Sequence, residues 1–306
     1  MKRALTQSYK ALGTRPIANT YALYWHRDQS NLDKVAQWYC DLWAINGSQH
    51  HSGCLSKSTD SADIFNKAPK ANAGFQELAS REGLIVITEN IWDVGNRKDN
   101  HHAKVTAHEY FHVYQGMMMY YFEKEDRIGI PKIIHERLSG PVWISEGGAE
   151  YFSYNVMGKY KWNGKSAKES YEYWMREALD SAKSEILDSK TKGVDIVLKN
   201  FDTRANIDKM KAEGLRAHFQ YEGGAWAMAY LRFLTGTNKG VFTNYYKDIA
   251  ELERTWRTKG KINYGWQKSF RANFGMTMNQ FYAKFNRFMK WSTSRQMKIL
   301  SAPLSR

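Results

Sequence analysis

The sequence has few residues that would break or cross-link its chain, with five prolines and two cysteines among 306 residues. Because proline interrupts helix interiors, so few prolines permit long helices. No stretch of 18 apolar residues occurs, so no transmembrane segment is expected. Fixed-period repeats, low-complexity tracts and linkers rich in proline, glycine or serine are also lacking. The chain is therefore predicted to form a single catalytic unit over residues 1–306, with approximate lobes at 1–125 and 126–306.

The residues that are present are typical of a globular protein, since 42% are hydrophobic and 14% are aromatic. A β-branched run at residues 84–88 predicts a strand in the N-terminal half. Apolar positions that recur every three or four residues predict helices over most of the remaining chain. These helices are expected near residues 32–45, 103–122, 142–157, 166–187, 223–234, 242–252, 266–274 and 278–291. Thr277 and Gln280 form a capping box at the start of the last one.

The balance of charge is strongly basic: 45 lysines and arginines against 31 aspartates and glutamates give a formal net charge of +14. Such a balance favours acidic partners, for example anionic envelope polymers, lipid headgroups or nucleic acid. The basic residues are scattered rather than gathered in one block, which is more typical of a solvated surface. No recognisable nucleic-acid-binding motif is present, so specific nucleic acid binding is not expected.

The cellular compartment is addressed by two weak signals. Residues 1–18 lack the apolar core of a secretory signal, so the chain is expected either to be cytoplasmic or to have lost a leader. Cys40 and Cys54 are separated by a stretch with glycine and serine, which could fold back and allow a disulfide bond. A disulfide would indicate an oxidising compartment. The alternative is a core thiol at Cys40 and an incidental thiol at Cys54.

The most informative segment is HEYFH at residues 108–112, which has the HExxH pattern. On a helix, His108 and His112 project from one face, so both imidazoles can bind a single Zn2+ ion. Glu109 flanks that face without being a ligand, and its carboxylate can deprotonate a zinc-bound water. The alternative is a helix that carries two surface histidines. A zinc hydrolase of this kind also needs a third protein ligand.

Glu146, in the segment WISEGGAEY, is the candidate for the third ligand and lies 34 residues after His112. Glu150 follows one helical turn later, and it can accept the Nδ1 proton of a ligand histidine and so orient that ring. Gly147 and Gly148 lower helix propensity, which indicates close approach of a neighbouring element, here the HExxH helix. The alternative for Glu146 and Glu150 is an ordinary pair of solvated glutamates.

Together, HEYFH and WISEGGAEY resemble the gluzincin branch of zinc metallopeptidases, which combines HExxH with a downstream helix that bears a glutamate ligand. The resemblance spans about residues 84–154. It implies an α+β, predominantly helical fold, with a zincin-like N-terminal part that holds a small sheet and the HExxH helix, and an all-α C-terminal lobe. It also implies a secreted or periplasmic location and one Zn2+ ion. The residues it assigns are the ligands His108, His112 and Glu146, the general base Glu109, and Glu150 as partner of His108.

The helix opening at residues 221–226 is similar to the segment in which gluzincin aminopeptidases carry a tyrosine that hydrogen-bonds the tetrahedral oxyanion. The resemblance implies Tyr221 in this role, with His218 as a rival. The alternative for Tyr221 is an aromatic ring packed at the helix entrance. If the strand at residues 84–88 lies at the cleft edge, it would align an extended substrate by backbone pairing.

The function predicted from these residues is zinc-dependent hydrolysis of peptide bonds in a peptide or protein substrate. Endopeptidase action is favoured, because the aminopeptidase pattern Gly-Ala-Met-Glu-Asn is missing. In the expected mechanism, Glu109 deprotonates the zinc-bound water and then passes the proton to the leaving amine. The alternative function is a catalytically silent zinc-containing module that binds or adheres through its basic, aromatic surface. The intact Glu109 favours the enzyme, because a purely structural zinc site does not use such a carboxylate.

Overall fold

The computed structural model describes residues 2–12, 20–26, 73–78, 84–91, 101–120, 140–164, 166–236, 240–249, 251, 265–301 and 303. The chain forms two compact units, Met1–Tyr114 and Gln115–Arg306. Three features expected from the sequence lie outside the described residues. They are the helix at residues 32–45, the lobe boundary at residue 125, and the possible disulfide between Cys40 and Cys54.

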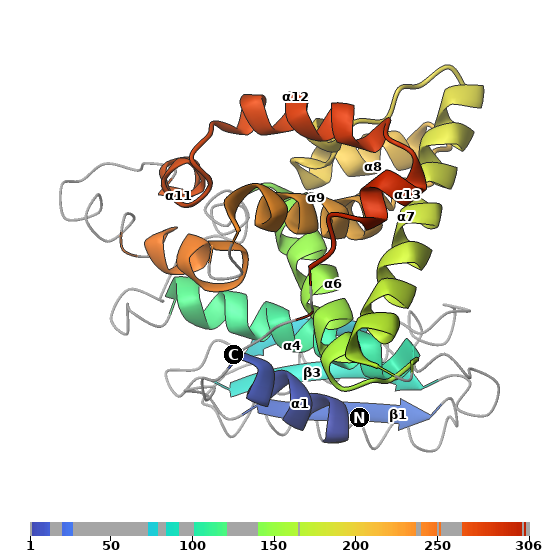
Figure 1. Ribbon diagram of the computed structural model, residues 1–306. Helices are drawn as coiled ribbons and strands as arrows, with labels where there is room; N and C mark the ends of the chain where they lie inside the picture. Colours follow the sequence, from blue (N-terminus) through green and yellow to red (C-terminus); the bar gives the residue numbers. More distant parts are fainter. Residues whose placement is uncertain are drawn as a thin grey trace. The chain divides into compact units, whose positions relative to one another are not determined.

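The first unit combines helices with a three-stranded sheet (Figure 1). Its helices are α1 (Lys2–Leu12) and most of α4 (His101–Tyr120), and its strands are β1 (Thr20–His26), β2 (Ala73–Leu78) and β3 (Leu84–Ile91). β3 begins where the sequence predicts a strand. It lies in the middle of the sheet, with β1 parallel on one side and β2 antiparallel on the other.

The central position of β3 rules out one expected role. Residues 85–91 of β3 pair with β1, and residues 84–89 pair with β2, so both hydrogen-bonding edges of the strand are occupied. An extended peptide adds only to an unpaired edge of a sheet. The expectation that this strand aligns a substrate at the edge of a cleft is therefore wrong.

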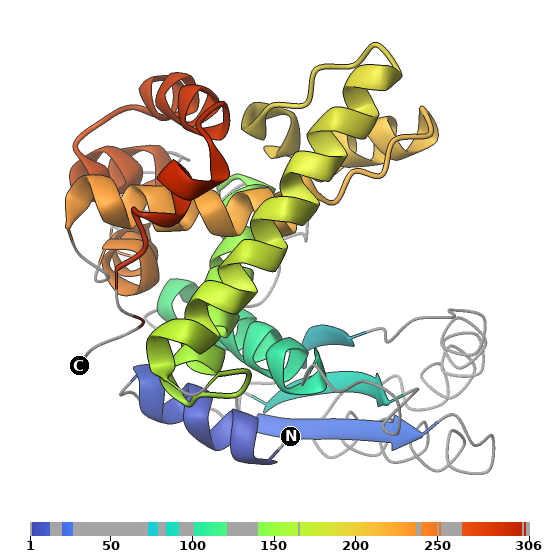
Figure 2. The same cartoon turned by 45° about the vertical axis from the view of Figure 1, so that its right-hand side comes forward.

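Every regular element described in the second unit is a helix. Its central helices are α6 (Val142–Lys159), α7 (Ala167–Thr191) and α9 (Phe219–Thr235), and each packs against the other two. Figure 2 shows α7 along its length. The shorter elements are η1 (Leu198–Phe201), α8 (Arg204–Ala212), η2 (Gly240–Asn244), α11 (Gly265–Phe274), α12 (Met278–Met289) and α13 (Thr293–Met297). Among the described helices, no segment combines the length and the hydropathy of a membrane span.

The helices of the second unit begin and end largely where the sequence predicts. The capping box at the start of α12 is confirmed: the Thr277 side chain accepts the backbone N–H of Gln280, and the Gln280 side chain accepts that of Thr277. Ser166 and Glu169 form a second capping box at the start of α7. Helices α1, α8 and α13 were not anticipated. α8 and α13 are short, whereas α1 has a clear apolar period that was overlooked.

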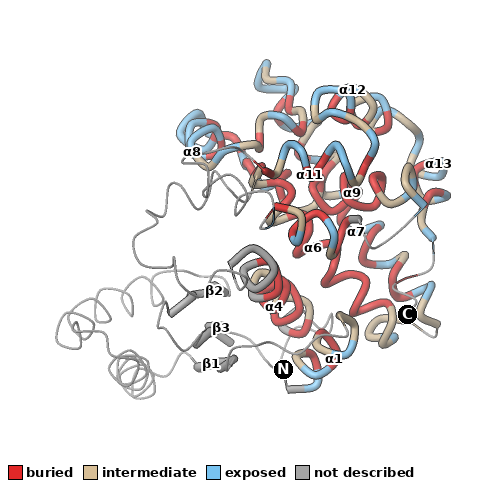
Figure 3. The backbone as a smooth tube through the Cα atoms, turned by 90° about the vertical axis from the view of Figure 1, so that its left-hand side faces the viewer, coloured by how far each residue is buried: buried red, intermediate tan, exposed pale blue. Residues whose placement is uncertain are grey.

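Helix α6 is buried along most of its length, as Figure 3 shows. The ring of Trp143 stacks on Phe281 of α12 with centroids 5.6 Å apart, and the ring of Tyr151 stacks on Phe242 with centroids 5.3 Å apart. Burying an aromatic ring of this size contributes roughly 1.5–3 kcal/mol. Among the described helices of its unit, α6 has the largest share of buried residues, and it carries Glu146.

Helices α6 and α9 approach each other very closely at Gly147 and Gly224. A Cβ atom on Gly147 would lie 2.3 Å from the carbonyl carbon of Gly224, and a Cβ atom on Gly224 would lie 2.8 Å from the Cα atom of Gly147. Only glycine permits backbones to touch in this way. The close approach inferred from the sequence is present, but the neighbour of Gly147 is α9 instead of the predicted HExxH helix.

The expected fold class has to be corrected. In an α+β fold with a zincin-like N-terminal part, a sheet would form one layer of the core. However, the structure describes buried and exposed side chains only for helices and the turns between them, and not for the three strands. The physical reason is that aromatic side chains from α6, α7, α9 and α12 pack on one another and form the core of the second unit. The described part of the chain is therefore mostly helical, and a zincin-like sheet architecture is not supported.

Candidate metal centre

His108 and His112 lie one turn apart on α4, as the HExxH spacing predicts. Their Nε2 atoms are 3.0 Å apart, and their ring planes are inclined by 78°. Two nitrogen ligands of one tetrahedral zinc ion would lie about 3.3 Å apart, given Zn–N bonds of roughly 2.0 Å. The imidazoles are therefore arranged much as ligands of a common ion would be. His108 and the adjacent Glu109 are each 7% exposed, so the general base expected from the sequence is enclosed.

Glu146, on the second turn of α6, completes this group of residues. The ligand atoms of His108, His112 and Glu146 all lie within 4.8 Å of one another, and the three residues could hold a metal ion. Two imidazoles and one carboxylate are a donor set that catalytic zinc sites use, with a fourth position for water. The donors therefore fit Zn2+, although other first-row divalent ions accept the same ligand types.

The first turn of α6 is held by contacts to Asp202. The backbone N–H of Val142 donates to the Asp202 carbonyl at 3.0 Å. The indole of Trp143 donates to the Tyr282 hydroxyl at 3.2 Å, and that hydroxyl donates to the Asp202 carboxylate. Burial raises the pKa of Asp202 to about 6, against the opposing effect of hydrogen bonds from Tyr282 and Trp143. These contacts fix the turn of α6 that precedes Glu146.

Gln115 links the last part of α4 to α6 within the second unit. Its Nε2 group donates to the Ser145 carbonyl at 3.0 Å and to the Tyr246 hydroxyl at 2.8 Å. The Ser145 hydroxyl in turn donates to Gln115 Oε1 at 3.4 Å. Gln115 is three residues after His112, and Ser145 directly precedes Glu146. The buried Gln115 amide thus connects α4, which carries His108 and His112, with the backbone next to Glu146.

Arg204, the first residue of α8, forms an ion pair with the candidate ligand Glu146. Its Nη2 atom donates to Glu146 Oε1 at 2.9 Å. The side chain of Arg204 is 42% exposed and that of Glu146 is 14% exposed, so the pair lies at the border between core and solvent. Burial disfavours the charge of Arg204, but Glu146 and Tyr221 outweigh this effect and raise its pKa. The guanidinium therefore stays charged beside the carboxylate.

The two candidate oxyanion donors lie in different environments. Tyr221, in the first turn of α9, is partly buried and interacts with Glu146 and Arg204. Burial and the negative charge of Glu146 raise the pKa of Tyr221 to about 12, so the phenol keeps its proton at neutral pH. The side chain of His218 is exposed, and its ring centroid lies 6.1 Å from that of Tyr221. Of the two candidates, Tyr221 is the one beside Glu146.

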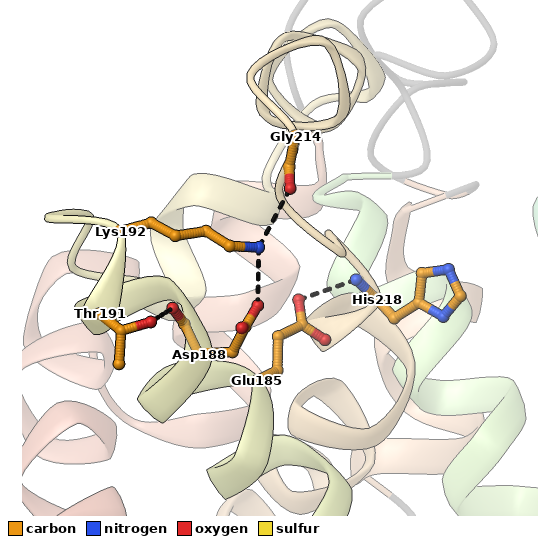
Figure 4. A network of polar contacts seen from close by, with 6 residues as sticks. All are labelled: Glu185, Asp188, Thr191, Lys192, Gly214 and His218. Atoms are coloured by element: carbon orange, nitrogen blue, oxygen red, sulfur yellow. Dashed lines mark hydrogen bonds and ion pairs between the residues drawn. The ribbon is translucent and has the colours of Figure 1, made fainter.

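A buried carboxylate caps the start of α9, as Figure 4 shows. Glu185 of α7 accepts hydrogen bonds from the backbone N–H groups of His218 and Phe219, at 2.9 and 3.2 Å. Burial raises the pKa of Glu185, although these hydrogen bonds oppose the rise. Ala217, directly before the helix, has a φ angle of 48°, a left-handed conformation that is strained for alanine. Glu185 and Ala217 therefore hold the start of α9, with the backbone of His218 and Tyr221, in a defined position.

Glu150, the predicted partner of His108, is buried on α6. Its carboxylate interacts with the Ser153 hydroxyl at 3.4 Å and with the Tyr154 hydroxyl. Burial and the negative charge of Glu150 raise the pKa of Tyr154 above its usual range, so this phenol is a donor at neutral pH. The orientation of His108 by Glu150 stays a prediction.

Comparison of the chain with protein-family models, with curated proteins and with solved structures gave no match. The resemblance to gluzincins therefore stays a prediction from the residues of the two motifs.

Three residues around the candidate ligand were not expected from the sequence: Gln115, Asp202 and Arg204. Gln115 carried a usable signal, because it extends the helical face of His108 and His112 by a further turn. Arg204 carried none, because 58 residues separate it from Glu146 and nothing in the spacing connects the two.

Proposed function

We propose that this protein is a zinc-dependent metallopeptidase of the gluzincin type, which hydrolyses peptide bonds in a peptide or protein substrate. The observation that carries the proposal is that ligand atoms of His108, His112 and Glu146 lie within 4.8 Å of one another, with Glu109 buried next to His108. Three protein ligands leave one position for water or substrate, which is the arrangement of catalytic zinc sites. A structural zinc site is usually closed by a fourth protein ligand.

The proposed roles follow from the chemistry of each residue. A bound zinc ion supplies Lewis-acid polarisation of the peptide carbonyl and activation of the attacking water. The Glu109 carboxylate takes a proton from that water and delivers it to the leaving amine. The position of Glu109 relative to the histidines is set by α4, because all three residues lie within two turns of one helix.

Tyr221 is the proposed donor to the oxyanion that forms from the attacked carbonyl. Its phenol keeps its proton because its pKa is about 12, and it lies beside Glu146. A donor aimed at the developing charge contributes about 3 to 4 kcal/mol to transition-state binding. His218, which is exposed, is the alternative donor.

The test is to compare wild type with Glu109→Gln for zinc content and for cleavage of a denatured protein, with and without a chelator. The variant should bind zinc as wild type does, because Glu109 is not a ligand, but should lose hydrolysis by several orders of magnitude. Glu213→Gln is a matched control, because Glu213 is exposed on the surface and pairs only loosely with Lys209 at 4.0 Å. Full activity of Glu109→Gln would exclude this general base.

The same assay separates the enzyme from a silent zinc-containing module. A wild-type chain that binds zinc but cleaves neither a denatured protein nor a peptide library would favour the binding module. The sizes of the products address the type of cleavage: internal fragments indicate an endopeptidase, and single amino acids indicate an exopeptidase. We expect internal fragments, and we expect the chelator to abolish their formation.

A further inference from the structure

Arg204 occupies a position at which it can act on the candidate metal ligand without being a ligand. It begins α8, and the preceding Thr203 caps this helix by accepting the backbone N–H of Asn206 at 3.2 Å. The cap fixes the backbone from which the Arg204 side chain extends to Glu146. The guanidinium donates to Glu146 at Oε1, at 2.9 Å.

The guanidinium also interacts with the hydroxyl of Tyr221, so it lies between a candidate ligand and the proposed oxyanion donor. Arginine can serve both neighbours at once, because its planar group carries five N–H donors in a fixed geometry. Lysine offers a compact charge without this geometry and would hold one neighbour less well. The chemistry of the position therefore favours arginine over any other cation.

We propose that Arg204 is a positioning residue of the metal centre, which grips Glu146 at Oε1 so that the carboxylate presents one oxygen to the ion. This inference rests on the metal centre of the proposed function. Hydrogen-bond partners of metal ligands orient those ligands and typically change metal affinity 10- to 100-fold when they are removed. Arg204 would act in this way on Glu146, while the histidines are arranged by α4 itself.

The direction in which zinc affinity changes when Arg204 is removed distinguishes a positioning residue from a charge that merely lies nearby. A positive charge beside the site repels a divalent cation, so removal of a bystander arginine would tighten zinc binding. Removal of a positioning arginine would instead weaken zinc binding, because Glu146 would then have to be ordered by the ion. The two interpretations predict opposite changes in one measurable quantity.

The experiment measures the zinc dissociation constant of the full chain by competition with a chromophoric chelator. Arg204→Met should raise this constant about 10- to 100-fold, and Arg204→Lys should recover part of the loss. Arg176→Met is the matched control and should leave the constant unchanged, because Arg176 is an exposed arginine on α7. The visible spectrum of the Co2+-loaded chain should also change in Arg204→Met and stay unchanged in the control.

Thermal unfolding in the presence of chelator shows whether each variant folds. If Arg204→Met does not fold, the zinc dissociation constant of Arg204→Lys decides the question alone. Zinc binding by a folded Arg204→Met variant that is as tight as wild type, or tighter, would overturn the inference. A wild-type chain that binds zinc without cleaving peptides would contradict the proposed peptidase but not the role of Arg204. A wild-type chain that binds no zinc would overturn both.

Discussion

Gly147 of α6 and Gly224 of α9 pack backbone against backbone, so that a Cβ atom on Gly147 would lie 2.3 Å from the carbonyl carbon of Gly224. Gly147 directly follows Glu146, and Gly224 lies three residues after Tyr221. This contact therefore sets the separation of the two helices that carry the candidate ligand and the proposed oxyanion donor.

A methyl group at this contact should be strongly destabilising. We expect Gly224→Ala to lower the free energy of unfolding by about 3 kcal/mol, because its Cβ atom would overlap the backbone of α6. Urea unfolding followed by circular dichroism measures the change. Gly193→Ala is the control: a Cβ atom there meets nothing within 4 Å, so only the strain of its φ angle of 77° is added, about 1 kcal/mol. Equal losses in the two variants would contradict the proposed helix contact.

The raised pKa of Asp202 predicts a pH dependence of stability. Its pKa is 3.8 ordinarily and about 6 in the folded protein, where burial disfavours the charge. The folded state therefore binds more protons than the unfolded state between about pH 4 and pH 6, and stability falls as pH rises through this window. We expect a loss of roughly 1–2 kcal/mol, which allows for screening of a partly exposed group.

Substitution of Asp202 isolates this contribution. Asp202→Asn should remove the fall between pH 4 and pH 6, whereas Asp208→Asn, at an exposed position on α8, should keep it. Urea unfolding at half-unit pH intervals provides the measurement. Parallel profiles for wild type and Asp202→Asn would show that Asp202 titrates normally in the folded protein.

The environments of Tyr221 and His218 predict different effects on catalysis. Tyr221→Phe should lower kcat about 100- to 1,000-fold with little change in KM, because the lost donor acts in the transition state. His218→Gln should change kcat less than threefold, since the imidazole is exposed. Steady-state kinetics with a fluorogenic peptide selected from the library assay would measure both. The reverse order of effects would assign the oxyanion contact to His218.

Local sequence patterns anticipated the helices and the residue types of the candidate metal centre. The HExxH spacing places His108 and His112 on one helical face, because the period of the α-helix is a local property of the chain. The capping box of Thr277 and Gln280 was predictable for the same reason, as it involves residues three positions apart. Glu146 was found because a second motif, with its own internal spacing, pointed to it.

Contacts between distant segments were not predictable in this way. The sequence indicated close packing at Gly147, but only the structure identified Gly224 of α9 as the neighbour. It indicated a strand near residue 84, but the order of the strands, which leaves no edge of β3 unpaired, was decided by non-local pairing with β1 and β2. The expected α+β class was wrong because residue patterns do not show which layer fills the core.

The sequence by itself determined which side chains could bind a metal ion, since ligand chemistry and helical period are properties of single residues and short segments. Tertiary structure alone decided what surrounds Glu146, including the guanidinium of Arg204, the Asp202 contacts at the start of α6 and the amide of Gln115. The physical reason is that hydrogen bonds and ion pairs depend on distances of a few ångströms, and only packing of the aromatic core brings residues so far apart in the chain that close.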